Sequence, residues 1–439
     1  MAADSPGGPG EDRSQETIAD ELVAQSSEAG QRRPTAFRAL RHRNYRLYFF
    51  GQLTSLAGTW MQSAAQAWLV LKLTNSSMML GVVSFAQFTP ILLVGLFAGV
   101  IVDRVDRRRL IIATQTLLML SAFTLAALTW SGRVRVYHVI VLAALNGTIG
   151  AFDMPGRQSF VVEMVGYEDL ANAIALNSMM FNGARMIGPA TAGLLIAWLG
   201  TAMCFFLNGL SFLAVIWSLI QMEIPVRAIA ASAASVTTQL GEGLAYVWRH
   251  RPIFYQMTLA AASNGLGYQY LVLVPLFARN VLHGDARTYG FLVAIQGLGS
   301  VLGAATLASR VTTTGIRNNL IIGLIISGFG ILVFGLSRLM FVSLAAQLMI
   351  GAGLTNFRAS NNTLVQVFVS DELRGRVMST YQLAAVGMTP LGALLVGFLG
   401  SRIGPRAAVT ICGAVILVCA VTLVIGLKSI GGAAQEQPA

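Results

Sequence analysis

The sequence predicts an all-α polytopic membrane protein in which twelve transmembrane helices form two six-helix bundles. Hydrophobic residues make up 55% of the 439 residues and charged residues only 11%, whereas soluble domains carry about 25% charged residues. The apolar residues gather in runs of about 20 residues or more, which is the length that crosses a bilayer. The second half of the chain also repeats features of the first half in the same order, which favours two related bundles.

Hydropathy divides the predicted helices into six before residue 223 and six after residue 252. The predicted spans lie near 47–72, 78–102, 110–130, 135–155, 170–197, 201–222, 253–282, 288–309, 318–337, 341–367, 376–400 and 405–427. The chain then consists of a disordered cytoplasmic tail at 1–36, a first six-helix bundle at 37–222, a cytoplasmic linker with a short surface helix at 223–252, a second six-helix bundle at 253–428 and a cytoplasmic tail at 429–439. The first tail is too polar to form a packed core.

The internal repeat rests on short matches between the two halves. Gly150–Pro155 closes the fourth span, and the similar run Thr355–Ser360 lies near the end of the tenth. Pro189 in the fifth span aligns with Pro390 in the eleventh after two small gaps. Because the matches keep their order, they indicate two bundles related by an axis along the membrane normal.

Basic residues indicate which side of the membrane each loop faces. With both termini inside, the inner loops and arms hold about twice as many Lys and Arg residues as the outer loops. Short basic loops stay in the cytoplasm, so the run Asp103–Arg109 between the second and third spans belongs to that side. We therefore expect a multi-pass protein of the bacterial cytoplasmic (inner) membrane with both termini cytoplasmic.

Composition argues against several other classes of protein. The formal net charge of +11 comes from arginines in short loops, where membrane topology demands them, so we expect no nucleic-acid partner. Cys204, Cys412 and Cys419 lie inside apolar runs, which argues against a disulfide or a metal site. The four histidines are scattered, and no catalytic or nucleotide-binding motif is found. We expect neither an enzyme nor a cofactor.

The stretch Gly95–Arg109 joins two spans through a short charged turn. Gly95 and Gly99 lie at helical spacing, which predicts that another helix approaches this face closely. Asp103 lies at the C-terminal end of its helix, where the helix dipole disfavours an anion, so it needs a cationic partner. It is either a surface acid paired with Arg107 or a latch onto the N-terminus of the eleventh span. The predicted conformational latch comprises Gly99, Asp103, Arg104, Arg107, Arg108, Asp153, Arg157, Arg374 and Arg376.

The motif Gly99-x-x-x-Asp103-Arg104-x-x-Arg107-Arg108 resembles the signature between the second and third spans of the major facilitator superfamily, with Asp106 where that pattern has glycine. Four further motifs are similar to the enterobactin-exporter-like group of that superfamily: Arg43-Asn-Tyr-Arg46, Phe152-Asp-x-Pro-x-Arg157-Gln-Ser, Asn182-x-x-Arg185-x-x-Gly188-Pro189 and Asp371-Glu-Leu-Arg-Gly-Arg376. The resemblance covers about residues 36–428. It implies the major facilitator fold, with alternating access by rocking of the two bundles around a central cavity.

The first predicted span carries a polar stripe. Its residues recur at intervals of three and four, so they project from one helix face. Lipid disfavours polar side chains, and the stripe therefore either lines an aqueous cavity or bonds a neighbouring helix. The family resemblance puts the polar residues of the seventh and tenth spans on the transport pathway, and the fifth span adds an arginine at membrane depth with a nearby asparagine. The predicted substrate cavity comprises Gln52, Ser55, Thr59, Gln62, Gln66, Asn182, Arg185, Asn264, Tyr268, Asn356 and Arg358.

Arg185 lies about 15 residues into its predicted span, hence near the middle of the membrane at roughly 1.5 Å per residue. No predicted span carries an acid at that depth. Arg185 is either a structural arginine, bonded by Asn182 and by carbonyls near the kink at Gly188 and Pro189, or a cation that an anionic substrate neutralises with help from Arg358. The run from Gly188 to Gly193 also resembles the antiporter motif of the superfamily.

The expected function is secondary active transport of a small-molecule substrate. Because no acid lies at the midplane, any proton site must lie toward the inner face, where Asp153 and Glu163 are the candidates. Asp153 is also expected to pair with an arginine of residues 103–109. The resemblance implies proton-coupled export of a medium-sized amphipathic compound, such as a siderophore or drug, by a monomer in membrane lipid. Import of a small solute, or a receptor or sensor on a transporter scaffold, stays open as an alternative.

Overall fold

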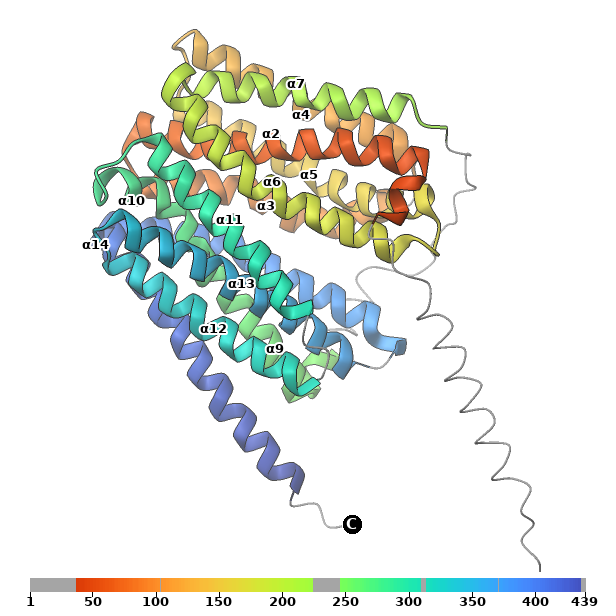
Figure 1. The fold of residues 1–439 in the computed structure, drawn as a ribbon, viewed down its shortest axis with the longest axis vertical. Coiled ribbons are helices and arrows are strands. Elements are labelled where there is room, and N and C mark those ends of the chain that lie inside the picture. Colours follow the sequence, from red (N-terminus) through yellow and green to blue (C-terminus); the bar gives the residue numbers. More distant parts are fainter. Residues whose placement is uncertain (1–36, 103, 224–244, 309–312, 370, 436–439) are drawn as a thin grey trace, which may run out of the picture.

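The computed structural model describes residues 37–102, 104–223, 245–308, 313–369 and 371–435. Helices make up nearly all of this part of the chain, and no strand occurs within it. The predicted all-α class is therefore confirmed for the described residues, and Figure 1 shows long helices that run roughly side by side.

The described part of the first half forms a short 3-10 helix followed by α-helices: η1 (Arg38–Arg41), α2 (Arg43–Thr74), α3 (Ser77–Val102), α4 (Arg107–Trp130), α5 (Val136–Val165), α6 (Leu170–Leu199) and α7 (Thr201–Ile220). The described part of the second half contains α9 (Arg251–Ala262), η2 (Ser263–Gly267), η3 (Tyr268–Leu273), α10 (Val274–Asn280), α11 (Ala286–Ala308), α12 (Thr313–Leu336), α13 (Met340–Phe368) and α14 (Asp371–Gln435). The helical backbone of α14 is interrupted at Gly404, where φ is 84°. A positive φ suits glycine, and Pro405 then begins a second helical stretch.

Helices α2 to α7 pack together as a first helix group, and α9 to α14 pack together as a second group (Figure 1). In the first group α2 contacts α6 and α7, α3 contacts α5, and α4 contacts α5 and α7. In the second group α13 contacts α11 and α12, while α14 contacts α9 and α12. The largest contacts between the groups are those of α6 with α11 and of α3 with α14.

Polar contacts bring the starts of α2 and α4 and the ends of α5 and α7 together at one end of the molecule. Arg43 and Arg108 donate to backbone carbonyls at the end of α7, and Arg107 forms an ion pair with Glu163 of α5. We call this the basic end, and we call the end where α2 turns into α3 the opposite end. In Figure 1 the basic end lies on the right and the opposite end on the left.

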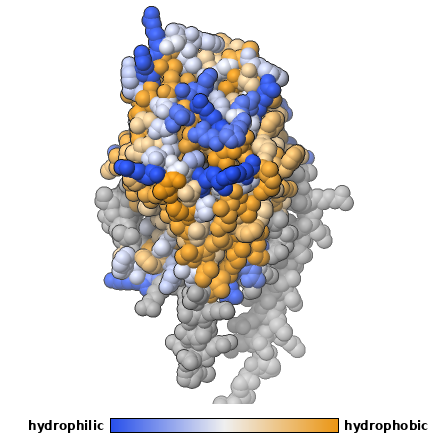
Figure 2. Space-filling model, turned by 90° about the vertical axis from the view of Figure 1, so that its left-hand side faces the viewer, coloured by the Kyte–Doolittle hydropathy of each residue, from blue (hydrophilic) through white to orange (hydrophobic). Residues whose placement is uncertain are grey.

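Long apolar helices make the chain an integral membrane protein. By length and hydropathy alone, eight helices of the described chain qualify as spans: α3, α4, α5, α7, α11, α12, α13 and α14. Helices α2 and α6 are long enough but carry many polar residues, and the segment from α9 to α10 is broken into short pieces. Figure 2 views the opposite end, where hydrophilic residues gather on part of the face and hydrophobic residues cover much of the rest. The count of twelve spans stays a prediction.

Buried apolar side chains form three clusters. The largest contains residues of both groups, and in it the indole of Trp68 in α2 stacks on the ring of Tyr289 in α11, with 6.0 Å between centroids. Two smaller clusters lie toward the basic end, each within one group: one around Tyr45 and Phe160, the other around Ile253. The two groups therefore share a core toward the opposite end and have separate cores toward the basic end.

Glycines let the two groups approach to backbone contact at the shared core. A Cβ atom added to Gly193 of α6 would lie 2.9 Å from the carbonyl oxygen of Ala286, and one added to Gly290 of α11 would lie 2.5 Å from that of Pro189. A Cβ atom added to Gly81 of α3 would lie 2.7 Å from a carbonyl oxygen of α14. Side chains larger than hydrogen do not fit at these positions without displacing backbone, which is why small residues are needed there.

The close approach predicted at Gly95 and Gly99 is not seen among the described residues. No atom of this part of the chain lies within 4 Å of a Cβ atom added at either position. Both glycines lie toward the basic end of α3, where the two groups have separate cores. The glycine that brings α3 against α14 is instead Gly81, near the other end of the same helix.

We expect Gly193→Ala to lower the midpoint of thermal unfolding of the detergent-solubilised protein, because overpacking of this kind costs about 1–3 kcal/mol. Gly183→Ala in the same helix is the matched control, since nothing in the described chain lies within 4 Å of a Cβ atom there. That control should leave the midpoint unchanged or raise it slightly, because alanine favours a helix more than glycine does. Equal midpoints for the two variants would show that the α6–α11 contact is not close.

Candidate functional site

A break in the helical backbone shapes one wall of the candidate site. After α9 ends at Ala262, the chain passes through the π-helical turn η2 and then through the 3-10 helix η3. Helix α14 packs directly on this break, since a Cβ atom added to Gly392 would lie 1.6 Å from the carbonyl oxygen of Gly265. Turns of this kind often occur at functional sites. Here the break carries Asn264 and Tyr268, which contact two arginines from other helices.

Arg185 of α6 is buried, with 7% of its surface exposed. Its Nη2 atom donates to Oε1 of Gln296 in α11 at 3.0 Å. Its guanidinium carbon also lies 5.7 Å from the centre of the Trp60 ring and 5.2 Å from the centre of the Tyr268 ring. Arg185 therefore contacts residues of both helix groups, and its charge is met by an amide oxygen and by aromatic rings.

Arg358 of α13 reaches the same aromatic ring from the second group. Its guanidinium carbon lies 4.5 Å from the centre of the Tyr268 ring, and its Nη2 atom donates to Oδ1 of Asn264. The Arg358 side chain is exposed, although Phe357 and Ser360 on the same helix are buried. One arginine of this pair is thus enclosed and the other is accessible to solvent.

We call this set of residues the central arginine cluster; it consists of Trp60, Arg185, Asn264, Tyr268, Gln296 and Arg358. Tyr268 joins its two halves, because both guanidinium groups lie over the same ring. None of the acids that the structure describes lies within 4 Å of either guanidinium group. The cluster therefore carries two positive charges whose described partners are neutral.

The partners of Arg185 differ from those that the sequence predicted. Asn182 is half-buried and donates to the backbone carbonyl of Ser178 at 2.8 Å, and no hydrogen bond from it to the Arg185 guanidinium group is found among the described residues. The acceptor is Gln296, which sequence reasoning missed together with Trp60. A signal for Gln296 was available, because it is a lone amide within a long apolar run of α11.

Gly188 and Pro189 lie within α6, whose helix runs unbroken from Leu170 to Leu199. A Cβ atom added to Gly188 would lie 2.6 Å from Cβ of Trp60, so this glycine lets α2 approach α6 beside Arg185. The structure thus gives Gly188 a packing role, while the kink at Pro189 stays a prediction.

The polar stripe of α2 is mostly buried. Four of its residues are buried, namely Gln52, Ser55, Gln62 and Gln66, whereas Thr59 is exposed. Oε1 of Gln62 accepts a hydrogen bond from Nδ2 of Asn208 in α7 at 2.8 Å, so this member of the stripe bonds a neighbouring helix. Asn356 of α13, another predicted cavity residue, is buried as well. Among the predicted cavity residues, only Asn264, Tyr268, Arg185 and Arg358 come together in the central arginine cluster.

Asp153 of α5 lies in a second polar cluster toward the basic end. Its carboxylate is 1% exposed and accepts hydrogen bonds from Thr114 at 2.7 Å and from Gln115 at 2.9 Å, both in α4. It also forms an ion pair with Arg157, one turn later in its own helix. We expected an arginine of residues 103–109 as its partner. Arg107 instead pairs with Glu163, which lies farther along α5.

The structure describes only some of the remaining residues of the predicted latch. Asp106 begins α4 by accepting a hydrogen bond from the backbone N–H of Arg109 at 2.9 Å, which explains the acid where the superfamily pattern has glycine. Arg104 is exposed. Asp103 and the side chains of Arg374 and Arg376 lie outside the described residues, so the latch between Asp103 and the start of α14 stays a prediction.

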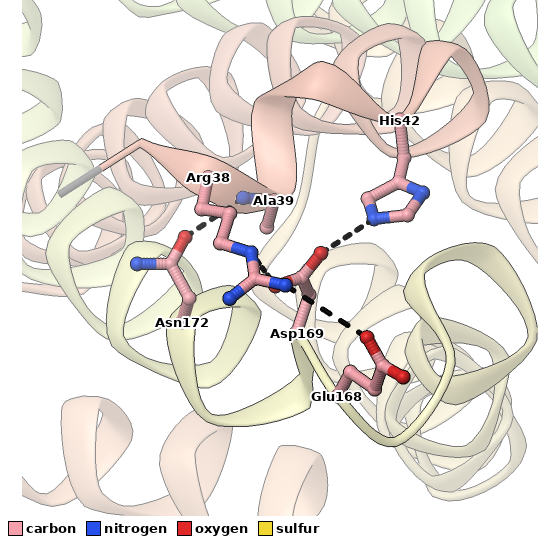
Figure 3. A network of polar contacts seen from close by, with 6 residues as sticks. All are labelled: Arg38, Ala39, His42, Glu168, Asp169 and Asn172. Carbon is pink, nitrogen blue, oxygen red and sulfur yellow. Dashed lines mark hydrogen bonds and ion pairs between the residues drawn. The ribbon is translucent and has the colours of Figure 1, made fainter. Parts of the chain in front are cut away.

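The segment before α2 is tied to the start of α6 (Figure 3). Asp169 binds Arg38 Nε and His42 Nε2, each at 2.7 Å, and Asn172 accepts a hydrogen bond from the backbone N–H of Ala39 at 2.9 Å. The motif Arg43-Asn-Tyr-Arg46 at the start of α2 adds a contact with α6, because the Tyr45 hydroxyl donates to the backbone carbonyl of Ala173 at 2.9 Å. These contacts stay within the first helix group, so they join α2 to α6 rather than one group to the other.

Comparisons with known proteins agree with this arrangement. Residues 34–437 match the model of a family described as transmembrane secretion effector. The chain is 27% identical to the staphyloferrin A transporter of Staphylococcus aureus, over 83% of this chain and 92% of that protein. It is 26% identical to the multidrug efflux pump Tap of Mycolicibacterium fortuitum, over 82% of this chain and 90% of that protein.

Among solved structures, the chain is similar to a bacterial homologue of the human lysosomal transporter Spinster in an inward-facing and occupied conformation. The TM-score is 0.70 at 14% sequence identity, over 88% of this chain and 97% of the other. At this identity the likeness concerns the fold alone. The family and the curated relatives are transporters rather than enzymes. The chain belongs to the transmembrane secretion effector family of the major facilitator superfamily.

Proposed function

We propose that this protein is a secondary active transporter of the bacterial inner membrane that exports a medium-sized amphipathic compound, either a siderophore or a drug, in exchange for protons. The relatives named for staphyloferrin A and for multidrug efflux support export of this class of compound. In this proposal the chain crosses the membrane twelve times, with α9 to α10 as one span and α14 as two. Residues 37–222 and 253–428 then form two six-helix bundles that act as a monomer.

The separation of the hydrophobic cores is the observation that carries the proposal. The two helix groups share one core toward the opposite end, whereas each keeps its own core toward the basic end. Two rigid groups that are joined at one end can rock against each other, which is how alternating access works in this superfamily. Short loops rich in arginine favour the cytoplasm, so a cavity between the groups would open to the cytoplasm in this conformation.

The central arginine cluster is the proposed substrate site. Arg185 belongs to the first group and Arg358 to the second, and residues of both groups surround the Tyr268 ring. Intramembrane charges of this kind usually mark a transport pathway, because they are costly to keep in lipid. Thr59 is the stripe residue that is exposed, so it is our candidate for a position on the cavity wall.

Proton coupling needs an acid, and the candidates are Asp153 and Glu163. Each is paired with an arginine, Asp153 with Arg157 and Glu163 with Arg107. Both pairs lie between the basic end and the middle of α5, which agrees with a proton site displaced toward the cytoplasm. The Glu163–Arg107 pair joins α5 to α4, and Asp153 accepts hydrogen bonds from Thr114 and Gln115 of α4, so a structural role competes with the coupling role.

Transport itself is tested by counterflow in proteoliposomes, with a panel of catecholates, macrolides and cationic dyes. We expect the reconstituted protein to exchange at least one compound of the panel across the bilayer, and protein-free liposomes to exchange none. A receptor or sensor on this scaffold would bind a compound of the panel without any flux. An importer would accumulate its substrate in right-side-out vesicles, whereas an exporter accumulates it in everted ones.

The proposed inward-open conformation predicts which stripe positions water reaches. In a variant that lacks Cys204, Cys412 and Cys419, Thr59→Cys should react with a membrane-impermeant thiol reagent added from the cytoplasmic side. Ser55→Cys is the matched control, because Ser55 lies one turn away on α2 and is 2% exposed. Substrate should slow the reaction at Thr59→Cys. Equal labelling at the two positions, or labelling from the outside alone, would contradict this conformation.

Asp153→Asn is expected to destabilise the protein, because an unpaired charge left behind by a buried ion pair costs about 3–5 kcal/mol. The double variant Asp153→Asn/Arg157→Gln leaves no unpaired charge. Its unfolding temperature should therefore be higher than the sum of the shifts of the two single variants predicts. The same variants separate structure from coupling. Flux that no longer responds to a pH gradient would assign the proton to Asp153, and flux that is still driven by the gradient would remove it as the carrier.

A further inference from the structure

Two guanidinium groups from different helix groups contact a single aromatic ring. Arg185 and Arg358 lie 5.2 Å and 4.5 Å from the centre of the Tyr268 ring. We propose that the two arginines form an anion subsite, which binds a carboxylate or another oxyanion group of the exported compound. This proposal rests on the proposed transport function and names the chemical class of its substrate.

Charge is the first argument for an anion. An arginine does not lose its proton in a protein, so both side chains stay positive inside the membrane region. Their described partners are the amide oxygens of Gln296 and Asn264 and the rings of Trp60 and Tyr268, none of which carries a negative charge. Both guanidinium groups lie over the same ring, so the two like charges repel each other. A bound anion between them would relieve this repulsion and offset the cost of keeping the charges out of water.

Unused hydrogen-bond donors are the second argument. Each guanidinium group has five N–H donors in a planar fork that matches the two oxygens of a carboxylate. One donor of Arg185 binds Gln296 and one donor of Arg358 binds Asn264. The Nε2 atom of Gln296 is also buried, and it has no hydrogen-bond partner in the described part of the chain. The cluster thus offers several N–H groups to one set of oxygen atoms.

The different exposure of the two arginines gives the subsite a direction. Arg358 is accessible to solvent, whereas Arg185 is enclosed between α6, α2 and α11. An anion that enters from solvent would therefore meet Arg358 before Arg185. Since the two residues belong to different helix groups, an anion that binds both would draw the groups together on the side where they are apart. Anion binding would then favour the closure that alternating access requires.

The alternative is that the arginines only hold the helices in place through Gln296, Asn264 and the rings. The two accounts differ in what they predict for ligand charge. A purely structural pair has no preference between an anion and a cation of the same shape. An anion subsite binds the anion better, and it loses that preference when the guanidinium groups are altered.

Two xanthene dyes of similar size test the proposal: fluorescein, which is an anion at neutral pH, and rhodamine 6G, which is a cation. Binding to the purified full-length protein is measured by fluorescence anisotropy, and flux of both dyes is measured in proteoliposomes. We expect fluorescein to bind more tightly than rhodamine 6G. Arg358→Gln should weaken the binding of fluorescein about tenfold or more, as expected when a hydrogen bond to a charged group is lost. In the same variant the affinity for rhodamine 6G should stay the same or increase.

Arg185→Lys and Arg358→Lys separate the charge from the planar fork. Each keeps the positive charge but loses the paired donors, so each should weaken fluorescein binding while the midpoint of thermal unfolding is preserved. Arg287→Lys is the matched control, because Arg287 lies over the Trp198 ring at 5.9 Å, outside the cluster. This control should not change the affinity for either dye. Should Arg185→Lys fail to fold, the exposed Arg358 carries the test alone.

The outcomes separate this proposal from the transport function. Binding or flux of rhodamine 6G without any preference for fluorescein would overturn the anion subsite and leave the transporter in place. Equal loss of both dyes in the arginine variants would assign the pair a structural role and would also overturn it. Absence of flux for both dyes and for the whole counterflow panel would overturn the transport function and the subsite with it.

Discussion

Backbone contact through glycine is the constraint on which the rest of this structure depends. Within lipid, helices gain little from hiding apolar surface from one another, so close packing has to hold them together. Gly193 and Gly290 bring α6 and α11 to that distance, and Gly81 does the same for α3 and α14. These contacts lie in the half of each helix toward the opposite end. They join the two helix groups into one core there and leave two separate cores at the basic end.

The position of the central arginine cluster follows from that joint. Met186 packs against Gly297 at the α6–α11 contact, since a Cβ atom added to Gly297 would lie 2.8 Å from Met186 Cα. The neighbouring pair, Arg185 and Gln296, is the described polar contact between the same two helices. The charge of Arg185 therefore lies directly beside the closely packed part of the α6–α11 contact. An arginine deeper in the packed region would have no room, and one in lipid would be too costly.

Sequence patterns predicted what depends on neighbours along the chain. The helices follow from runs of apolar residues. The partner of Asp153 was predicted wrongly as an arginine of residues 103–109, although Arg157 lies one helical turn away in the same helix. Which helix packs on a glycine depends on the fold and not on neighbouring residues. The spacing of Gly95 and Gly99 therefore predicted a close helix contact there, whereas Gly81 makes the contact with α14. Gln296 was missed for the same reason, because only the fold brings it to Arg185. The wall formed by η2 and η3 was also invisible, since π-helical and 3-10 turns have no hydropathy period of their own.

The distribution of the ion pairs favours the proposed movement of the two groups as units. Every ion pair that the structure describes lies within one helix group or one loop, including those of Asp153 with Arg157, Glu163 with Arg107 and Asp169 with Arg38. Charged pairs of this kind are directional and costly to break when partly buried, so they resist changes inside a group. Glycine contacts between the groups impose no such directional penalty on small rotations. The chain therefore keeps its directional bonds inside each group and uses close packing between them, which is the combination that rocking of rigid halves requires.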